Sequence, residues 1–200
     1  AYYRSPNGRI VFGHRRLSIV GLDDRPTVMS IAKKNDPLNR IAIVFNGEIY
    51  NYKELKKAFL EKGYRSVSPS DFEVIVVAWE EWGENCVDHL EGEFAFVLYD
   101  EEADAVFMAR DRTGLKPLFY GIHENRFFFA SEPKGILTAW PNDARKVNGR
   151  SVAEFILGAH AFAAGTPRLG SSFFEGISAL PPGHCGRVEA DQVKLRQYWD

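Results

Sequence analysis

The middle of the chain constrains its fold most strongly, because short apolar runs follow one another there at hairpin-length intervals. The runs are rich in aromatic and β-branched residues, and Asp/Glu, Asp/Gly and His/Glu/Asn turns separate them. This pattern is typical of antiparallel strands. Parallel neighbours need a crossover of roughly a dozen residues or more, so a doubly wound sheet of the Rossmann type is excluded. The predicted meander comprises Phe94–Tyr99, Ala105–Ala109, Leu118–Ile122 and Phe127–Ala130.

Strands are also predicted towards both ends of the chain. Arg9–Val20 and Arg40–Phe45 are rich in β-branched and apolar residues, and the polar connection 33–39 between them indicates a hairpin-type loop. Near the C-terminus, an alternating pattern around a turn at residues 190–191 predicts a terminal strand pair. The Gly/Ala/Pro-rich stretch Ala159–Ser172 lacks periodicity, and we expect a mobile loop there.

Two helices are predicted between the early strands and the meander. Apolar residues recur at helical spacing over 52–63, with Lys and Glu on the opposite face. A second helix is predicted over 71–82, where Gly83 provides a typical stop. Ser70 followed by Glu73 three residues later has the spacing of a capping box. Helices and antiparallel strands together indicate the α+β class.

Composition excludes several classes of protein. With 200 residues, of which 45% are hydrophobic, the chain can bury a sizeable core. The formal net charge of -2 argues against binding to nucleic acid or anionic membranes through general electrostatic attraction. No apolar run approaches the ~20 residues that span a bilayer, and no leader-like segment opens the chain. Cys86 and Cys185 form no CxxC pair, so we expect a soluble, cytoplasmic protein.

Familiar catalytic signatures are missing. The sequence contains no GxGxxG, GxxxxGK[ST], GxSxG or HExxH motif, so nucleotide-loop, serine-hydrolase and zincin hypotheses lack their minimal residues. The five histidines never recur at i, i+4, which argues against a metal site. Both cysteines are interpreted as small buried hydrophobic residues, Cys86 in an apolar-flanked helical segment and Cys185 in a turn and strand segment.

Polar clusters embedded among apolar strands are the remaining candidates for a site. Backbone N–H groups at strand ends and helix starts can point at a small ligand, and a zwitterion would suit the residue types present. Arg16 can grip a carboxylate, and Asp71 can bind an ammonium group. Asn46 with the Gly47 N–H can face a developing oxyanion. Ordinary turns and surface ion pairs remain the alternative. The clusters are Gly13–Ile19, Asn46–Tyr50, Ser70–Glu73 and Arg110–Pro117.

Seven segments give these clusters a family context. In chain order they read GHRRLSI, VFNGEIYNYKEL, SDFEV, EGEFAFVLYD, ARDRTGLKPLFY, SEPKGIL and FEGISALPPGH, between Gly13 and Trp199. This series closely resembles the class II, N-terminal-nucleophile glutamine amidotransferase domain of the asparagine synthetase B family. The resemblance implies a four-layer αββα sandwich of antiparallel sheets. It also implies that the domain hydrolyses glutamine and passes ammonia to an ATP-dependent synthetase domain that amidates aspartate.

The resemblance further implies roles for individual residues in a glutamine site. Arg16 would bind the α-carboxylate, with the backbone of Leu17 and Ile19 lining the pocket. Asn46 and Gly47 would form the oxyanion hole, and Glu48 and Asp71 would hold the side-chain amide region and the α-ammonium. Arg110 and Asp111 are interpreted instead as a structural ion pair at a strand end, or as a surface that faces the synthetase domain.

The start of the chain departs from the family pattern. The family's nucleophile is a cysteine at the mature N-terminus, whose α-amino group serves as its base, whereas this sequence begins with Ala1. Arg16 follows within 15 residues, although the family separates the nucleophile from this arginine by several tens of residues. We therefore expect a missing N-terminal segment, and we expect the chain alone to be inactive. Residues 1–157 are interpreted as an incomplete amidotransferase domain, and 158–200 as the loop and strand pair that lead to an absent synthetase domain.

Partners and cofactors follow from the same resemblance. Glutamine is the expected ligand, the synthetase domain is the expected partner in cis, and a homodimer is compatible with the family. No cofactor is expected in this chain, since ATP and Mg would bind only in the synthetase domain. The alternative function is a nucleophile-less scaffold module like those of β-lactam synthetase or lasso-peptide cyclase relatives, and a glutamine-binding sensor is a weaker one. A retained charge and oxyanion hole favour the glutaminase.

Overall fold

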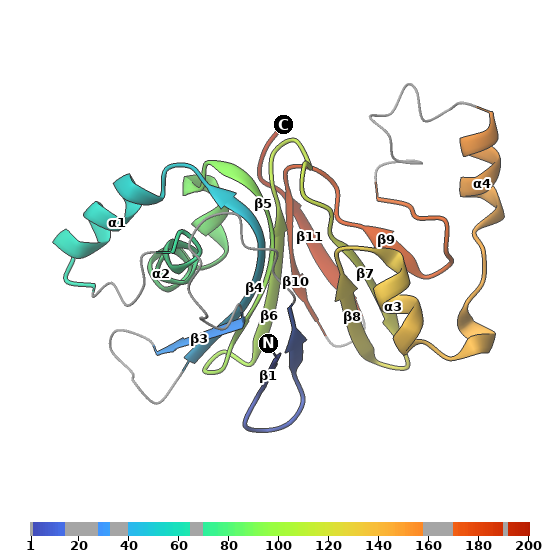
Figure 1. Ribbon diagram of the computed structural model, residues 1–200, viewed down its shortest axis with the longest axis horizontal. Coiled ribbons are helices and arrows are strands. Elements are labelled where there is room, and N and C mark those ends of the chain that lie inside the picture. Colours follow the sequence, from blue (N-terminus) through green and yellow to red (C-terminus); the bar gives the residue numbers. More distant parts are fainter. Residues whose placement is uncertain (1, 15–27, 33–39, 65–69, 158–169, 190–191) are drawn as a thin grey trace.

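Antiparallel sheets form the centre of the molecule. A computed structural model describes residues 2–14, 28–32, 40–64, 70–157, 170–189 and 192–200 (Figure 1). The larger sheet has the strand order β11-β10-β6-β5-β4-β3, and every neighbouring pair is antiparallel. Its strands are β3 (Val28–Ala32), β4 (Arg40–Ile49), β5 (Gly92–Asp100), β6 (Ala105–Arg110), β10 (His184–Val188) and β11 (Val193–Gln197).

A smaller sheet packs against the first, and helices cover the outer faces of both (Figure 1). It has the order β8-β7-β9, from β7 (Phe119–His123), β8 (Arg126–Ala130) and β9 (Ile177–Ala179). A separate hairpin joins β1 (Tyr2–Arg4) and β2 (Val11–Gly13). The helices are α1 (Tyr52–Glu61), α2 (Glu73–Trp82), the 3-10 helix η1 (Gly83–His89), α3 (Pro133–Ala139), the 3-10 helix η2 (Asn142–Ala144) and α4 (Gly149–Ile156).

Alternation along β5 creates two of the three cores. Phe94, Phe96 and Leu98 belong to a core shared with α1 and α2. Ala95 and Val97 project to the opposite face and join the core between the two sheets. A third core, built on Ile136, Trp140 and Ile177, lies between the smaller sheet and α3. The layers are therefore helix, sheet, sheet and helix, which confirms the predicted αββα sandwich.

Two details of the predicted middle of the chain are wrong. Ser70 and Glu73 do not form a capping box, because α2 begins at Glu73 with Phe72 at the N-cap and no side-chain cap. The meander is also interrupted, since β5 and β6 lie in the larger sheet whereas β7 and β8 lie in the smaller one. The chain changes sheets between Arg110 and Phe119, at the RDR loop, by which we mean Arg110–Pro117.

Arg110 and Asp111 are buried, so the interpretation of these two residues as a surface is wrong, although Leu115 of the same RDR loop is exposed. Arg110 donates to the carbonyl oxygens of Lys116 (2.8 Å), Leu180 (2.7 Å) and Gly114 (2.6 Å). Asp111 is fully buried, and its carboxylate accepts backbone N–H groups together with the Thr113 hydroxyl. Each side chain is thus satisfied mainly by backbone groups of the turn. The donors to Asp111 are Phe94, Thr113, Leu115 and Lys116.

Acid is expected to weaken this scaffold. Burial raises the pKa of Asp111, but the N–H groups of Lys116, Leu115 and Thr113 outweigh burial and hold the pKa below its ordinary value of 3.8. A depressed folded-state pKa stabilises the fold above pH 3.8, and this stabilisation is lost as the pH falls through the folded-state pKa. Asp111→Asn should therefore lower the free energy of unfolding by about 1–2 kcal/mol at neutral pH. As the pH falls, the free energy of unfolding of this variant should decline less steeply than that of the wild type. Urea denaturation between pH 2 and pH 7 measures both effects, and an unchanged acid decline would contradict the assignment.

The C-terminal residues complete both sheets. β9 pairs with β7 in the smaller sheet, and β10 pairs with β6 in the larger one. The predicted terminal strand pair is β10 and β11, which are antiparallel neighbours. The Tyr198 hydroxyl donates to the Arg110 carbonyl oxygen at 2.7 Å. Most of the expected loop at 159–172 lies outside the described residues, but Ser171 forms a β-bridge with Ser178. The division of the chain at residue 157 stays a prediction.

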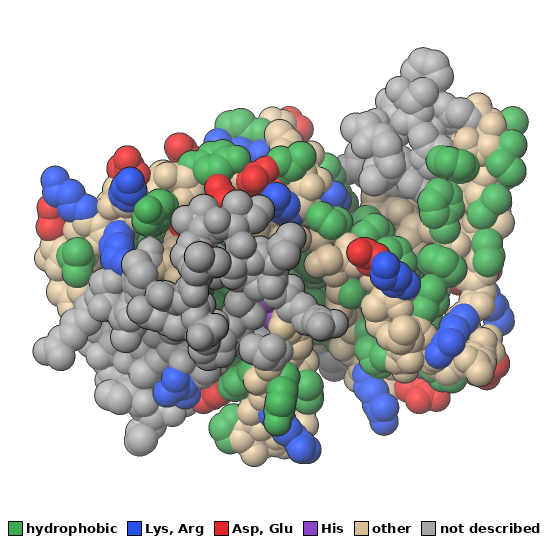
Figure 2. All heavy atoms as spheres, in the orientation of Figure 1, with side chains coloured by type: hydrophobic (Ala, Val, Ile, Leu, Met, Phe, Trp, Pro, Cys, Tyr) green, Lys and Arg blue, Asp and Glu red, His purple; other side chains and the backbone are tan. Residues whose placement is uncertain are grey.

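Helix α4 carries apolar side chains that the described residues cover only in part. It lies at the edge of the molecule beyond α3, and Figure 2 shows apolar side chains gathered over it. Phe155 meets Phe173 edge-to-face at 5.5 Å, whereas Ile156 and Leu157 are exposed.

Among the helices that the structure describes, none is long and apolar enough to cross a membrane.

Candidate functional site

Three predicted site residues follow one another at the C-terminal end of β4. Strand alternation places Asn46 on the same face as Val44, which belongs to the core between the two sheets. Asn46 lies opposite Ala95 of β5, another residue of that core. Gly47 and Glu48 continue the strand, and the Glu48 side chain is exposed. The amide of Asn46 therefore faces the space between the sheets.

That space contains a cavity of about 320 Å³. Its size falls within the range of small-ligand pockets, and its lining combines apolar side chains with polar groups. Asn46, His14 and Ser131 supply polar side chains among the described lining residues. The other lining residues are Gly13, Val44, Phe45, Ala95, Phe96, Val97, Pro117, Leu118, Phe129 and Ala130.

Gly47 allows β4 and β5 to approach very closely beside this cavity. Its φ angle is +139°, a conformation that residues with a side chain rarely adopt. A Cβ atom at Gly47 would lie 2.0 Å from the Glu93 carbonyl oxygen. On the opposite strand, a Cβ atom at Gly92 would lie 2.2 Å from the Glu48 carbonyl oxygen. The strand end next to Asn46 therefore requires glycine on both strands.

Asp71 is brought to the same strand end by the start of α2. Its Oδ2 atom accepts the backbone N–H of Ile49 at 3.0 Å. Its carbonyl oxygen accepts the N–H of Val74 at 3.2 Å, so Asp71 opens the first turn leading into α2. The side chain is half-buried, and among the described residues it makes no other hydrogen bond. Its second oxygen can therefore face a cationic ligand group.

Glu48 lies opposite a second acidic residue, whose charge is offset by a lysine. It is directly opposite Glu93 in the β4–β5 register, an arrangement of like charges that is unfavourable on its own. Lys116 of the RDR loop forms an ion pair with Glu93 at 3.3 Å, and the Lys116 N–H is held by Asp111. The loop thus supplies a positive charge that offsets the charge of Glu93.

The remaining predicted site residues are not placed. Arg16, Leu17 and Ile19 lie outside the described residues, so their glutamine-binding roles stay predictions. The nearest described residue, His14, lines the cavity together with Asn46.

Neither cysteine is suited to nucleophilic attack. Both thiols are buried. Burial raises the pKa of Cys86 far above its ordinary value, and the neighbouring Cys185 raises it further. Burial also raises the pKa of Cys185 to about 11, against the opposing influence of Arg196. A reactive thiolate needs a lowered pKa and access to substrate, so the interpretation of both as buried small residues is confirmed.

Sequence reasoning gave no role to some residues that the structure places around the site. Phe129, Ala130 and Ser131 line the cavity from β8 and the residue after it. The SEPKGIL segment, which begins at Ser131 and carries part of the family resemblance, could have indicated that this part of the chain lies at the site. Among the described residues, no group of three or more His, Cys, Asp and Glu side chains is arranged to hold a metal ion.

The arrangement combines an amide donor in the cavity with a carboxylate at the same strand end. The family described as "Glutamine amidotransferase domain" matches residues 2–199. The chain belongs to this glutamine amidotransferase family. Asp71 and Asn46 are of the residue types that can bind an ammonium group and stabilise an oxyanion, respectively.

Individual relatives of this amidotransferase domain are consistent with the family assignment. "Asparagine synthetase [glutamine-hydrolyzing] 3" of Bacillus subtilis is 36% identical over 192 residues, which are 96% of this chain and 30% of that protein. "Amidase chry2" of Gibberella zeae is 32% identical, covering 98% of this chain and 27% of that protein. The chain thus spans less than a third of the length of these relatives.

Solved structures share the fold. The B. subtilis glutamine phosphoribosylpyrophosphate amidotransferase, complexed with ADP and GMP, aligns over 92% of this chain and 34% of its own, with a TM-score of 0.59 and 19% identity. This similarity supports the antiparallel α+β architecture of the amidotransferase domain.

Proposed function

We propose that this domain hydrolyses glutamine within a longer, ATP-dependent asparagine synthetase and supplies the ammonia that amidates aspartate. The observation that carries the proposal is the placement of the Asn46 amide in the cavity, with the Asp71 carboxylate anchored to Ile49 nearby. Relatives named as glutamine-hydrolysing asparagine synthetases support it, and they are more than three times as long as this chain.

In the proposed reaction, a cysteine thiolate attacks the side-chain amide carbon of glutamine. The carbonyl oxygen becomes an oxyanion, ammonia leaves after protonation, and water then hydrolyses the thioester to glutamate. Asn46 and the Gly47 N–H stabilise the oxyanion. Asp71 holds the α-ammonium and Glu48 the amide region, while Arg16 binds the α-carboxylate beside the backbone of Leu17 and Ile19.

The nucleophile is proposed to lie outside these 200 residues, at the mature N-terminus of the longer protein. Cys86 and Cys185 are buried with raised pKa values, which disfavours both as substitutes. The ATP site is likewise proposed to lie in the remainder of the longer protein.

The 200-residue chain alone should release no glutamate from glutamine above the background rate, whereas the longer protein should. An oxyanion hole and a substrate clamp cannot replace the covalent step. Glutamate formation is measured for both proteins, before and after treatment with a thiol-alkylating reagent.

Two experimental results would contradict the proposed function, each in a different way. Alkylation-sensitive turnover that maps to Cys86 or Cys185 would overturn the proposed nucleophile. A longer protein that makes its product from ammonia but never from glutamine would overturn glutamine hydrolysis and favour the scaffold function.

A further inference from the structure

We propose that Lys56 is a positioning residue for the glutamine site, because its ion pair with Glu73 fixes the first turn of α2 and so holds the Asp71 carboxylate against the end of β4. The inference rests on the proposed function insofar as Asp71 binds the ammonium group of glutamine. Neither Lys56 nor Glu73 needs to touch glutamine for this role.

The ion pair joins α1 to the first residue of α2. Lys56 Nζ lies 3.5 Å from Glu73 Oε2. Glu73 is 4% exposed, so its charge is almost completely removed from water. A carboxylate at a helix N-terminus is favoured by the helix dipole, but a buried charge also needs a partner of opposite sign. Lys56 supplies that charge.

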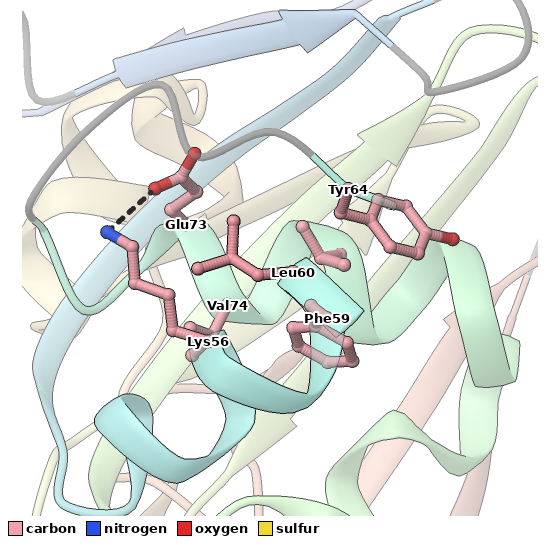
Figure 3. A pocket seen from close by; sticks show the side chains of 7 residues that line it. Lys56, Phe59, Leu60, Tyr64, Glu73 and Val74 are labelled. Carbon is pink, nitrogen blue, oxygen red and sulfur yellow. Dashed lines mark ion pairs between the residues drawn. The ribbon is translucent and has the colours of Figure 1, made fainter. Parts of the chain in front are cut away.

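Figure 3 shows the Lys56–Glu73 pair at the rim of an apolar contact between the two helices. Phe59 and Leu60 of α1 meet Val74 of α2 there, and the space that remains between them is about 20 Å³. The Glu73 side chain is almost fully buried beside this contact, so its carboxylate would be poorly solvated without the lysine.

A closed ring of contacts links this pair to the site. From Ile49 the chain turns into α1, and Lys56 reaches across to Glu73. Asp71 precedes Glu73 by two residues, and its carboxylate returns to the Ile49 N–H at 3.0 Å. The carbonyl oxygen of Asp71 also accepts from Val74 in the first turn. Loss of the ion pair opens the ring, so the first turn of α2 and Asp71 are free to shift together.

The same two helical segments offer a matched control. Lys62, directly after α1, forms an ion pair with Glu81 near the C-terminal end of α2. This second pair joins the same elements but lies more than two helical turns along α2 from Asp71. A general loosening of the α1–α2 contact should follow from breaking either pair, whereas displacement of Asp71 should follow only from breaking the first.

The test uses the longer protein with glutamine or ammonia as nitrogen donor. Lys56→Met should raise the KM for glutamine about tenfold, because a small displacement of a charged clamp weakens substrate binding strongly. The kcat with glutamine and both constants with ammonia should change less than about twofold. Lys62→Met should leave the KM for glutamine within about twofold of the wild-type value. Lys56→Arg should also keep the KM for glutamine close to the wild-type value, since arginine retains the charge.

A structural readout tests positioning without reference to activity. Exchange of the Ile49 amide hydrogen should become about tenfold faster in Lys56→Met, because its acceptor is the Asp71 carboxylate. The exchange rate of the Ile49 amide hydrogen should stay unchanged in Lys62→Met. Glu73→Gln removes the charge while conserving shape, and it should reproduce both effects if Lys56→Met does not fold.

Two outcomes separate this inference from the proposed function. If the wild-type protein uses glutamine but Lys56→Met behaves like Lys62→Met in KM and in exchange, Lys56 is an ordinary structural residue and the inference is overturned. If the wild-type protein uses ammonia but not glutamine, the proposed function fails, and the role of Lys56 in glutamine binding fails with it.

Discussion

Asn46→Ala is expected to lower the kcat for glutamine hydrolysis by the longer protein about 10²–10³-fold, because removal of one oxyanion donor costs roughly this much in other enzymes. The Asn46 side chain faces the cavity between the sheets, where surrounding apolar residues strengthen a hydrogen bond to a developing charge. The KM for glutamine should change much less, since this donor acts mainly on the tetrahedral intermediate. Steady-state assays with glutamine and with ammonia measure the difference.

Asn51 provides a matched asparagine control. Its side chain bridges the turn after β4 to the end of η1, donating to the His89 carbonyl oxygen and accepting the Glu91 N–H. Asn51→Ala should destabilise the fold but leave the kcat for glutamine within about twofold. Equal losses with glutamine and ammonia in Asn46→Ala would show that Asn46 is a structural support.

Gly47→Ala is expected to lower the free energy of unfolding by about 3 kcal/mol or more. The φ angle of +139° imposes a strain of about 1–3 kcal/mol on a residue with a side chain. The overlap of its Cβ atom with the Glu93 carbonyl oxygen adds a further cost of about 1–3 kcal/mol. Urea denaturation of the chain measures the loss.

Gly13→Ala is the corresponding control on β2. Gly13 has no atom within 4 Å of its Cβ position and no positive φ angle. Its replacement should change the free energy of unfolding by no more than about 1 kcal/mol. If the two variants were equally stable, the close approach of β4 and β5 at Gly47 would be contradicted.

Local patterns predicted the framework well because they report which face of an element is buried. Period-2 apolar runs marked the strands from β5 to β8, and Gly83 marked the end of α2 with a φ angle of +57°. The polar residues 46–48 hid the last part of β4, which extends from Arg40 to Ile49. A strand that carries a site at its end loses the alternation by which a strand is recognised.

Contacts between distant residues explain the errors. Glu73 has the spacing of a capping residue relative to Ser70, but its ion-pair partner Lys56 lies on another helix. Local sequence rules do not include that partner. The change of sheet after β6 depends likewise on Asp111, whose carboxylate collects N–H groups from β5 and from its own turn.

The site was only partly accessible from residue types. The ligand chemistry of Asn46 and Asp71 follows from their side chains, but their proximity depends on the hydrogen bond between Asp71 and Ile49. The cavity between the sheets depends on β8, which begins 77 residues after the end of β4. The family resemblance supplied the roles that local patterns could not, and the role of Arg16 stays a prediction.

Calorimetric titration of the longer protein, with the proposed N-terminal cysteine nucleophile replaced by alanine, measures ligand binding without turnover. Glutamine is compared with glutaramate, which has the same amide and carboxylate but no α-ammonium group. The wild-type pocket should bind glutamine at least about tenfold more tightly than glutaramate, and Asp71→Asn should remove most of this preference. An equal preference for glutamine in both proteins would contradict a glutamine site built on Asp71 at the end of β4.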